Sequence, residues 1–373
     1  MRKLLTAAGA LIASNFGGAM VGGCGDGDYS SPAQANDGGS VSPGDGSSSD
    51  GSSSDGSSSD GSPTDASTGG DGGDGGDGGF VARVFSLTIP PVTGTAGAEN
   101  TKCITKRLGN MGVVHIGALH TTIASGTSAE LIVYKVDDTV ESTTPTECTP
   151  FAFMAKADGG TALTFTQKAD EVLQFPSQDG FTFADNQMIR LELHAVDPTG
   201  AGFGATATFT TMPDSAYQQE VGMLVEGSVD VSINANQTAV LNQNLPAPSA
   251  LAHAELIFLS GHQHQYGTAL ALGALDGGTT PLYDNASWND PALTTCTPVL
   301  PIEAGGTFGL TCNWNNVSSA TVKFGFAAND EQCFFRAHYA PATESQVCVH
   351  SQQVGTQDTC CPSASGICAQ LFP

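Results

Sequence analysis

The chain has 373 residues, a formal net charge of −25 and only 13% charged residues, and 47 of its residues are glycine. This length leaves room for two domains once a low-complexity N-terminal region is set aside. Eleven Asp residues fall within 24–79, and Arg2 and Lys3 are the only cations before residue 80, so residues 80–373 carry a net charge of −16. An acidic surface of this size argues against nucleic acid and anionic lipid headgroups as partners.

Residues 1–23 have the features of an export signal. Arg2 and Lys3 precede a mostly apolar run over 4–13 that is too short for a confident membrane span. The segment ends in Val21-Gly22-Gly23-Cys24, which is similar to a bacterial lipobox, where the cysteine is lipidated after cleavage. We therefore expect an exported protein of the bacterial cell envelope, periplasmic or at the outer-membrane surface, anchored to the membrane through a lipid on Cys24. The alternative is an ordinary secretory cleavage nearby, with Cys24 as one more thiol.

Residues 24–79 contain Gly-Ser-Ser-Ser-Asp and Gly-Gly-Asp repeats and have no Lys or Arg. Such a segment has no apolar surface to bury and repels itself, which predicts a disordered acidic linker.

Ten cysteines in an exported chain predict disulfides rather than free thiols. If Cys24 is lipidated, nine remain. An odd number means that one is free, that one pairs between chains, or that the lipobox interpretation is wrong.

From residue 80 onward, short apolar or alternating runs are broken by Gly, Pro, Asn and Asp about every ten residues, and no segment has a sustained helical periodicity. This pattern is typical of an all-β sandwich or jelly roll. A polar pause over 213–220 places a boundary near residue 216. We therefore predict two tandem jelly-roll sandwiches, over 80–216 and 217–373, and expect a monomer.

His262 and His264 stand two residues apart after the apolar run 256–260. If the strand continues through them, both imidazoles lie on one face, roughly 7 Å apart at Cα, and can share a metal that needs at least one more ligand. The alternative is a pair of polar residues on a solvated strand edge.

The second predicted sandwich resembles the copper type II ascorbate-dependent monooxygenases, which include peptidylglycine α-hydroxylating monooxygenase and dopamine β-monooxygenase. The resemblance rests on a series of motifs in order: His262-Gln263-His264-Gln265-Tyr266-Gly267-Thr268, Leu282-Tyr283-Asp284, Trp288-Asn289-Asp290-Pro291, Cys312, Phe324-Gly325, Asp330-Glu331-Gln332-Cys333 and Tyr339. The first sandwich resembles the N-terminal half of the family more faintly, through Phe85-Ser86-Leu87-Thr88-Ile89, Cys103, Arg107-Leu108 and Leu191-Glu192-Leu193-His194.

The resemblance implies two sandwiches that each hold one copper. One copper, bound by His-x-His and a Met, meets oxygen and a small-molecule or peptide substrate. The other, bound by a His-His pair and a third His, stores an electron from ascorbate. It also implies a disulfide between Cys312 and Cys333, which would stabilise the fold by roughly 3 kcal/mol.

The ligand sets depart from the family pattern. Gln332 stands at the position of the methionine, and an amide oxygen binds Cu(I) poorly. Alignment of the first sandwich puts Ala129 and Glu130 where the His-His pair should be, so only His194 remains of that site.

We therefore expect at most one copper site, at His262, His264 and Gln332, with His194 as a remnant of the other. Three functions stay open: an exported copper monooxygenase that uses an ascorbate-like reductant, a non-catalytic metal-binding or recognition lipoprotein on the same scaffold, and a surface protein that binds no metal.

Overall fold

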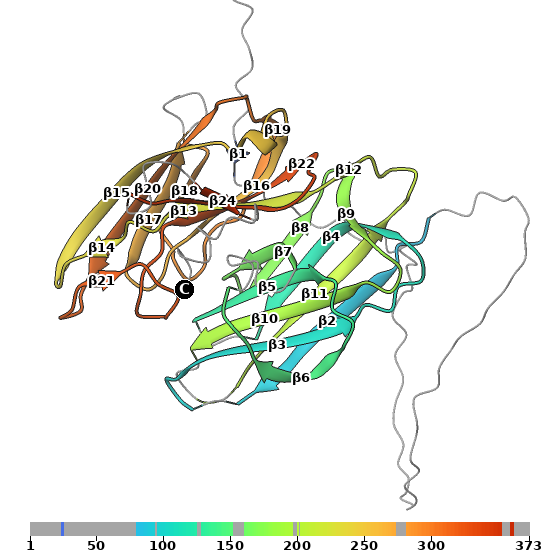
Figure 1. Cartoon of the computed structure of the whole chain (residues 1–373), viewed down its shortest axis with the longest axis horizontal. Coiled ribbons are helices and arrows are strands. Elements are labelled where there is room, and N and C mark those ends of the chain that lie inside the picture. The colour runs from blue at the N-terminus through green and yellow to red at the C-terminus, as the bar shows by residue number, and fades with distance from the viewer. Residues whose placement is uncertain are drawn as a thin grey trace, which may run out of the picture. The chain divides into compact units, whose positions relative to one another are not determined.

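The computed structural model (Figure 1) describes residues 24–25, 80–93, 95–124, 128–151, 160–196, 200, 202–273, 281–352 and 359–361. The described residues form strands, turns and loops with one 3-10 helix, η1 (Ser249–Leu251), which confirms the all-β class. Apart from Cys24 and Gly25, the predicted signal peptide and linker lie outside the described residues. None of the described segments is a helix long and apolar enough to cross a membrane.

Two sheets are formed by residues 84–220. One has the order β6 (Ser142–Glu147), β3 (Glu99–Arg107), β10 (Met188–Val196), β5 (Ser128–Val136) and β7 (Thr161–Thr166). The other has the order β12 (Gln219–Glu220), β9 (Asp179–Phe183), β4 (Val114–Ile123), β11 (Phe203–Met212) and β2 (Val84–Val92), with β8 (Asp170–Gln174) paired to β4. Leu131 and Leu191 of the first sheet share a buried core with Ile116 and Phe209 of the second, so the two sheets form a sandwich.

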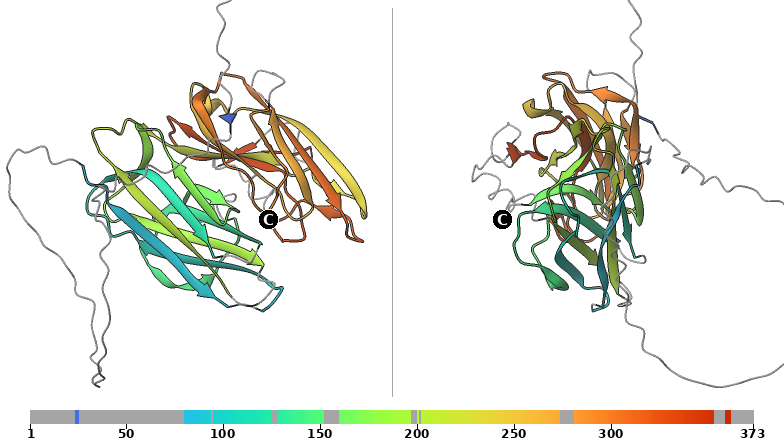
Figure 2. Two further views of the ribbon diagram at one scale, coloured as in Figure 1. Left: turned by 180° about the vertical axis from the view of Figure 1, so that it is seen from behind. Right: turned by 90° about the vertical axis from the view of Figure 1, so that its right-hand side faces the viewer.

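The chain passes to a second set of sheets after β12. The largest has the order β1 (Cys24–Gly25), β19 (Thr294–Pro301), β16 (Glu255–His262), β22 (Phe334–Ala340), β13 (Gly222–Ser228), β23 (Gln346–His350) and β24 (Thr359–Cys361). The next has the order β15 (Gln237–Pro246), β20 (Thr307–Asn316), β17 (Gly267–Gly273) and β18 (Tyr283–Asn285), and β14 (Ser232–Ile233) pairs with β21 (Val322–Lys323). The long pair β15 and β20 is visible at one edge in Figures 1 and 2. These sheets form a second sandwich, in whose core Leu259 and Phe335 of the largest sheet pack with Leu270 and Leu310 of the four-stranded sheet. The jelly-roll order of connections stays a prediction.

Strands β16 and β22 are buried on both faces, which explains their nearly continuous apolar sequences. In β16, Leu256 and Leu259 pack within the second sandwich, whereas Ile257 and Phe258 join the core of the first. In β22, Arg336 forms an ion pair with Glu171 of β8. Residues 82–373 accordingly belong to one compact unit, in which the two sandwiches share a buried interface.

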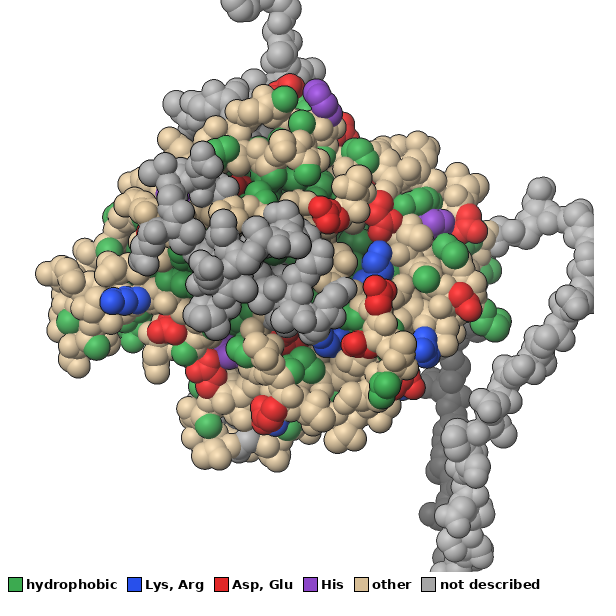
Figure 3. Space-filling model, in the orientation of Figure 1, with side chains coloured by type: hydrophobic (Ala, Val, Ile, Leu, Met, Phe, Trp, Pro, Cys, Tyr) green, Lys and Arg blue, Asp and Glu red, His purple; other side chains and the backbone are tan. Residues whose placement is uncertain are grey.

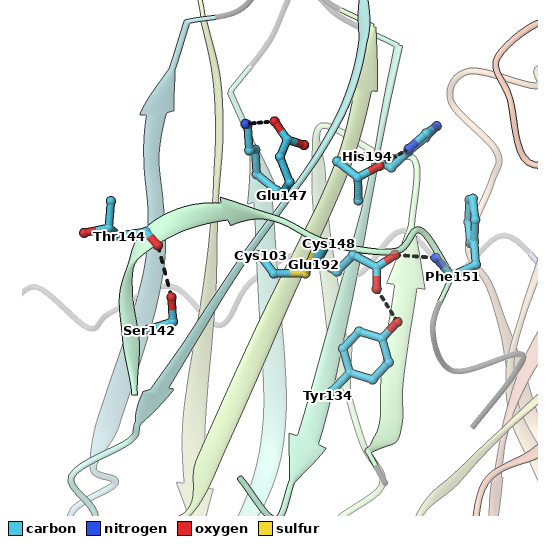
Figure 4. The surroundings of a disulfide bond; sticks show 11 residues. Cys103, Tyr134, Ser142, Thr144, Glu147, Cys148, Phe151, Glu192 and His194 are labelled. Atoms are coloured by element: carbon cyan, nitrogen blue, oxygen red, sulfur yellow. Dashed lines mark hydrogen bonds and ion pairs between the residues drawn. A yellow bond between two sulfur atoms is a disulfide. The ribbon is translucent and has the colours of Figure 1, made fainter. Parts of the chain in front are cut away.

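Four disulfides join described cysteines: Cys24–Cys296, Cys103–Cys148, Cys312–Cys333 and Cys348–Cys360. The Cys312–Cys333 bridge is the one that the resemblance implies. Figure 4 shows Cys103–Cys148 beside Glu192, a buried carboxylate that accepts hydrogen bonds from the Tyr134 hydroxyl and the Phe151 amide.

The expectation for Cys24 needs correction. Its sulfur is bonded to that of Cys296, where β1 pairs with β19. A sulfur in a disulfide cannot also carry a thioether-linked lipid, so Cys24 is not a lipid anchor in this structure. The pairing also removes the odd cysteine that lipidation would leave.

Candidate metal centre

Alternation along β16 directs His262 toward the first sandwich. Gly261 faces the other way, where an added Cβ would lie 2.8 Å from Leu270 and 2.9 Å from Tyr283. His262 therefore lies on the opposite face of the strand. His264 follows in the turn before β17, and its ring centroid is 5.3 Å from that of His262. Both imidazoles are buried, at 2% and 5% exposure, so the alternative of a solvated strand edge is wrong.

Glu130 of β5 meets these histidines from the first sandwich. Leu131 and Val133 of β5 point into the core of that sandwich, whereas Ile132 and Tyr134 point to the shared interface. Glu130 is two residues before Ile132 and therefore lies on the same face of β5. Its Oε1 lies 3.6 Å from Nε2 of both His262 and His264. One ligand atom from each of these three residues lies within 4.8 Å of the others, close enough to hold one metal ion.

The hydrogen bonds of both imidazoles leave their Nε2 atoms free. His264 Nδ1 lies 3.1 Å from the carbonyl oxygen of Asp330, which can only accept, so Nδ1 carries the proton. His262 Nδ1 lies 3.0 Å from Oε1 of Gln167. Each Nε2 then presents a lone pair toward Glu130, and a partner on the other ring nitrogen is the usual arrangement of metal-bound histidine.

Several buried polar atoms of this cluster have no hydrogen-bond partner in the part of the chain that the structure describes: His262 Nε2, His264 Nε2, Glu130 Oε2 and Gln332 Oε1. Leaving such atoms unsatisfied costs roughly 1–3 kcal/mol each. Burial holds the pKa of His262 well below its usual range and lowers that of His264 to about 4, so both rings are neutral. Burial also raises the pKa of Glu130 to about 7. Neutral imidazoles and a poorly solvated carboxylate are suited to bind a metal cation.

The loop before β22 holds the remaining part of the site. Gln332 is fully buried next to His262, and its amide group donates to the carbonyl of Gly325 at 3.0 Å. Glu331 accepts hydrogen bonds from the backbone amides of His264 and Tyr266. The Cys312–Cys333 disulfide then ties this loop to β20. These contacts fix the loop on which Gln332 is carried.

His194 lies near the cluster but is not part of it. Its Nδ1 is hydrogen-bonded to Thr101 at 2.8 Å, and its Nε2 lies 2.9 Å from Oε1 of Glu99. Burial lowers the pKa of His194, but the hydrogen bond to Glu99 and the charges of Glu130 and Glu99 outweigh burial and raise it. With both nitrogens in use, His194 offers no lone pair to a metal. Among the described residues, no second group of three His, Cys, Asp or Glu side chains converges as the first does.

A cavity of about 210 Å³ reaches the cluster. Glu130 and His264 line it, together with Glu99, His194 and Trp288. A small molecule in this cavity would therefore have access to two of the three candidate ligands.

The sequence analysis interpreted Glu130 as evidence that a ligand pair had been lost, whereas the structure brings its carboxylate to the remaining histidines. One signal was available: Glu130 directly precedes the apolar run Leu131–Tyr134, where a charge is costly unless it is paired or binds a metal. Gln167, which contacts both Glu130 and His262, gave no signal in the sequence.

Comparison with known proteins assigns a family to part of the chain. Residues 234–360 match the family described as copper type II ascorbate-dependent monooxygenase, C-terminal domain. This segment is about a third of the chain and includes both histidines and Gln332, whereas Glu130 lies outside it. No curated protein matches the chain.

Similar solved structures include the major capsid protein P2 of bacteriophage PM2, with 9% identity, a TM-score of 0.31, and coverage of 69% of this chain and 97% of that one. They also include a putative secreted protein from Eubacterium rectale, with 6% identity, a TM-score of 0.18, and coverage of 64% and 68%. These scores are too low to support any functional argument.

The donor set fits a divalent transition metal. Two neutral imidazoles suit copper, zinc and iron, and a carboxylate oxygen adds a hard, charged ligand. The thioether that favours Cu(I) is missing, since Gln332 takes its place.

Proposed function

We propose that this chain, which belongs through residues 234–360 to the copper type II ascorbate-dependent monooxygenase family, is an exported protein that binds one copper ion through Glu130, His262 and His264. Gln332 supplies a further oxygen near the same point. The protein holds Cu(II) and does not carry out the two-copper hydroxylation that the resemblance implies.

One observation supports this proposal above all others. The two Nε2 atoms and the Glu130 carboxylate converge in the buried interface, and neither nitrogen has a hydrogen-bond partner among the described residues. A structural cluster of buried polar groups would pair them with one another or with the backbone. A metal ion would satisfy all of these donors at once.

The donor set favours the oxidised state of copper. Bound copper would supply a redox-active Lewis-acidic centre, but a carboxylate and an amide oxygen stabilise Cu(II) over Cu(I). Insertion of oxygen also needs two electrons, and the described residues contain no second cluster to store one. Tight binding of Cu(II) is therefore better supported than turnover.

Copper titration tests the proposal directly. We expect the wild-type protein to bind one Cu(II) per chain and the His262→Ala variant to bind none at the same concentration. His120→Ala is a suitable control because His120 is a partly exposed histidine paired with Asp170 at the surface. A wild-type chain that binds no copper, or a His262→Ala variant that binds it unchanged, would refute the proposal.

The cavity supports a second candidate function. Because it reaches Glu130 and His264, a small-molecule or peptide substrate could approach the metal. The protein would then be a monooxygenase that takes electrons singly from an ascorbate-like reductant. Oxygen uptake by the copper-loaded protein with ascorbate, above that of free copper and abolished by His262→Ala, would favour this function over storage of Cu(II).

Export and partners belong to the same proposal. Four disulfides support an oxidising compartment, and the N-terminal pattern supports secretion into the bacterial cell envelope. Lys and Arg side chains on the face shown in Figure 3 are separate and lie among Asp and Glu, which supports the absence of nucleic acid as a partner. We propose that the protein acts as a monomer.

A further inference from the structure

Gln167 joins the candidate ligands of the two sandwiches. It follows β7 and is buried, with 9% exposure. Its Oε1 lies 3.0 Å from His262 Nδ1, and its Nε2 donates to Glu130 Oε1 at 3.1 Å and to the carbonyl of Gln263 at 3.2 Å. A single carboxamide therefore contacts a ligand from each sandwich and the backbone between the two histidines.

The orientation of this carboxamide is fixed by its partners. The carbonyl of Gln263 can only accept a hydrogen bond, so the NH2 group of Gln167 must face it. If the amide of Gln167 were flipped, its Oε1 would face two acceptors, Glu130 Oε1 and the carbonyl oxygen of Gln263. Oε1 therefore faces His262 Nδ1, which must donate, and the lone pair of His262 is left on Nε2, the atom that faces Glu130.

The same contact orients Glu130. Its Oε1 accepts from Gln167, whereas its Oε2 has no hydrogen-bond partner within the described ranges. The oxygen that accepts from Gln167 is the same Oε1 that lies 3.6 Å from Nε2 of both histidines. The amide thus determines which atom His262 presents and where the carboxylate is held.

We propose that Gln167 is the positioning residue of the metal site: it fixes the tautomer of His262 and the direction of Glu130, so that donors from two sandwiches converge on one ion. This inference rests on the proposed function. It differs from a role in packing alone because it makes the histidine tautomer and the metal geometry depend on one carboxamide.

Replacement of Gln167 by Met separates these two roles. Methionine keeps the length and nearly the volume of the side chain but has no amide to bond His262 Nδ1 or Glu130. Gln187→Met is the matched control: Gln187 is also a buried glutamine of the first sandwich, and its amide group also donates to two acceptors, which are the backbone carbonyls of Val136 and Met188. Gln187 does not contact the candidate ligands.

Cu(II) is the probe, and the readouts are its affinity in competition with a chelator and the electron paramagnetic resonance spectrum of the loaded protein. We expect Gln167→Met to weaken Cu(II) binding by about 10- to 100-fold and to change the spectrum. Gln187→Met should bind with wild-type affinity and spectrum. In the metal-free protein, 15N chemical shifts should show His262 protonated on Nδ1 in the wild type and a mixture of tautomers in Gln167→Met.

Failure of the positioning role and failure of the proposed function give different results in these experiments. Wild-type affinity, spectrum and tautomer in Gln167→Met would overturn the positioning role and leave the proposed function intact. A wild-type protein without a copper site would overturn the proposed function and this inference with it. If Gln167→Met does not fold, Gln167→Glu tests the orientation of Glu130 separately, because it keeps the acceptor for His262 but loses both donors; unchanged copper binding in that variant would overturn the inference that Gln167 directs Glu130.

Discussion

Replacement of Glu130 by Gln should stabilise the metal-free protein while it removes the metal site. Glu130 is 5% exposed, and burial raises its pKa from the ordinary 4.5 to about 7. Because the folded protein disfavours the ionised form, its stability falls as the pH rises from 4.5 to 7. A shift of this size corresponds to about 3 kcal/mol. Glutamine keeps the acceptor for Gln167 and has no charge to bury.

Denaturant unfolding of chelator-treated protein at several pH values measures this effect. We expect Glu130→Gln to match the wild type near pH 4 and to exceed its free energy of unfolding by about 3 kcal/mol at pH 8. Other buried carboxyls, such as Glu331, contribute equally to both proteins and cancel. The exposed Glu303→Gln is the control and should leave the stability unchanged at every pH. Equal or lower stability of Glu130→Gln at pH 8 would refute the reasoning.

Copper binding should depend on pH through the same residue. Glu130 must lose its proton to bind the metal, whereas the pKa of His264 is about 4 and that of His262 is also lowered. The Cu(II) affinity of the wild type should therefore fall by about tenfold per pH unit below pH 7. Titrations between pH 5.5 and 8 should show a flat, much weaker affinity in Glu130→Gln. The same slope in both proteins would assign the proton to another group.

Three further predictions concern the loop and the disulfides. Joint replacement of Cys312 and Cys333 by Ala should lower the free energy of unfolding by about 3 kcal/mol, measured with denaturant, and also weaken copper binding; unchanged affinity would mean that the bridge does not position the loop. Gln332→Met should tighten Cu(I) binding by on the order of tenfold in competition with a Cu(I) chelator, with little gain for Cu(II). Non-reducing peptide mass spectrometry of the exported protein should find Cys24 linked to Cys296; a diacylated N-terminal peptide would restore the lipid anchor.

Local patterns predicted the features that depend on neighbours in the chain. The short alternating runs indicated an all-β fold because strand periodicity is a property of the sequence itself. The spacing of His262 and His264 placed them together because residues two apart in the chain stay close, although β16 ends at His262 and His264 lies in the turn that follows it. The ordered motifs around them resemble the family whose C-terminal domain matches residues 234–360.

The interpretation of Cys24 shows where local patterns fail. The residues before it are similar to a lipobox, but its partner Cys296 is 272 positions away. A pairing of this kind depends on β1 lying beside β19, which no short stretch of sequence specifies.

The sequence alone determined two-thirds of the candidate metal centre, since His262 and His264 lie on one short segment. Only the tertiary structure supplied Glu130, because that carboxylate belongs to another sandwich and reaches the histidines through the packing of β5 against the second domain. Ligand identity at such an interface depends on which faces two sandwiches bury against each other, and this is decided by the whole core. The residue that looked like the loss of one copper site is, in the fold, the third side chain of the candidate metal centre.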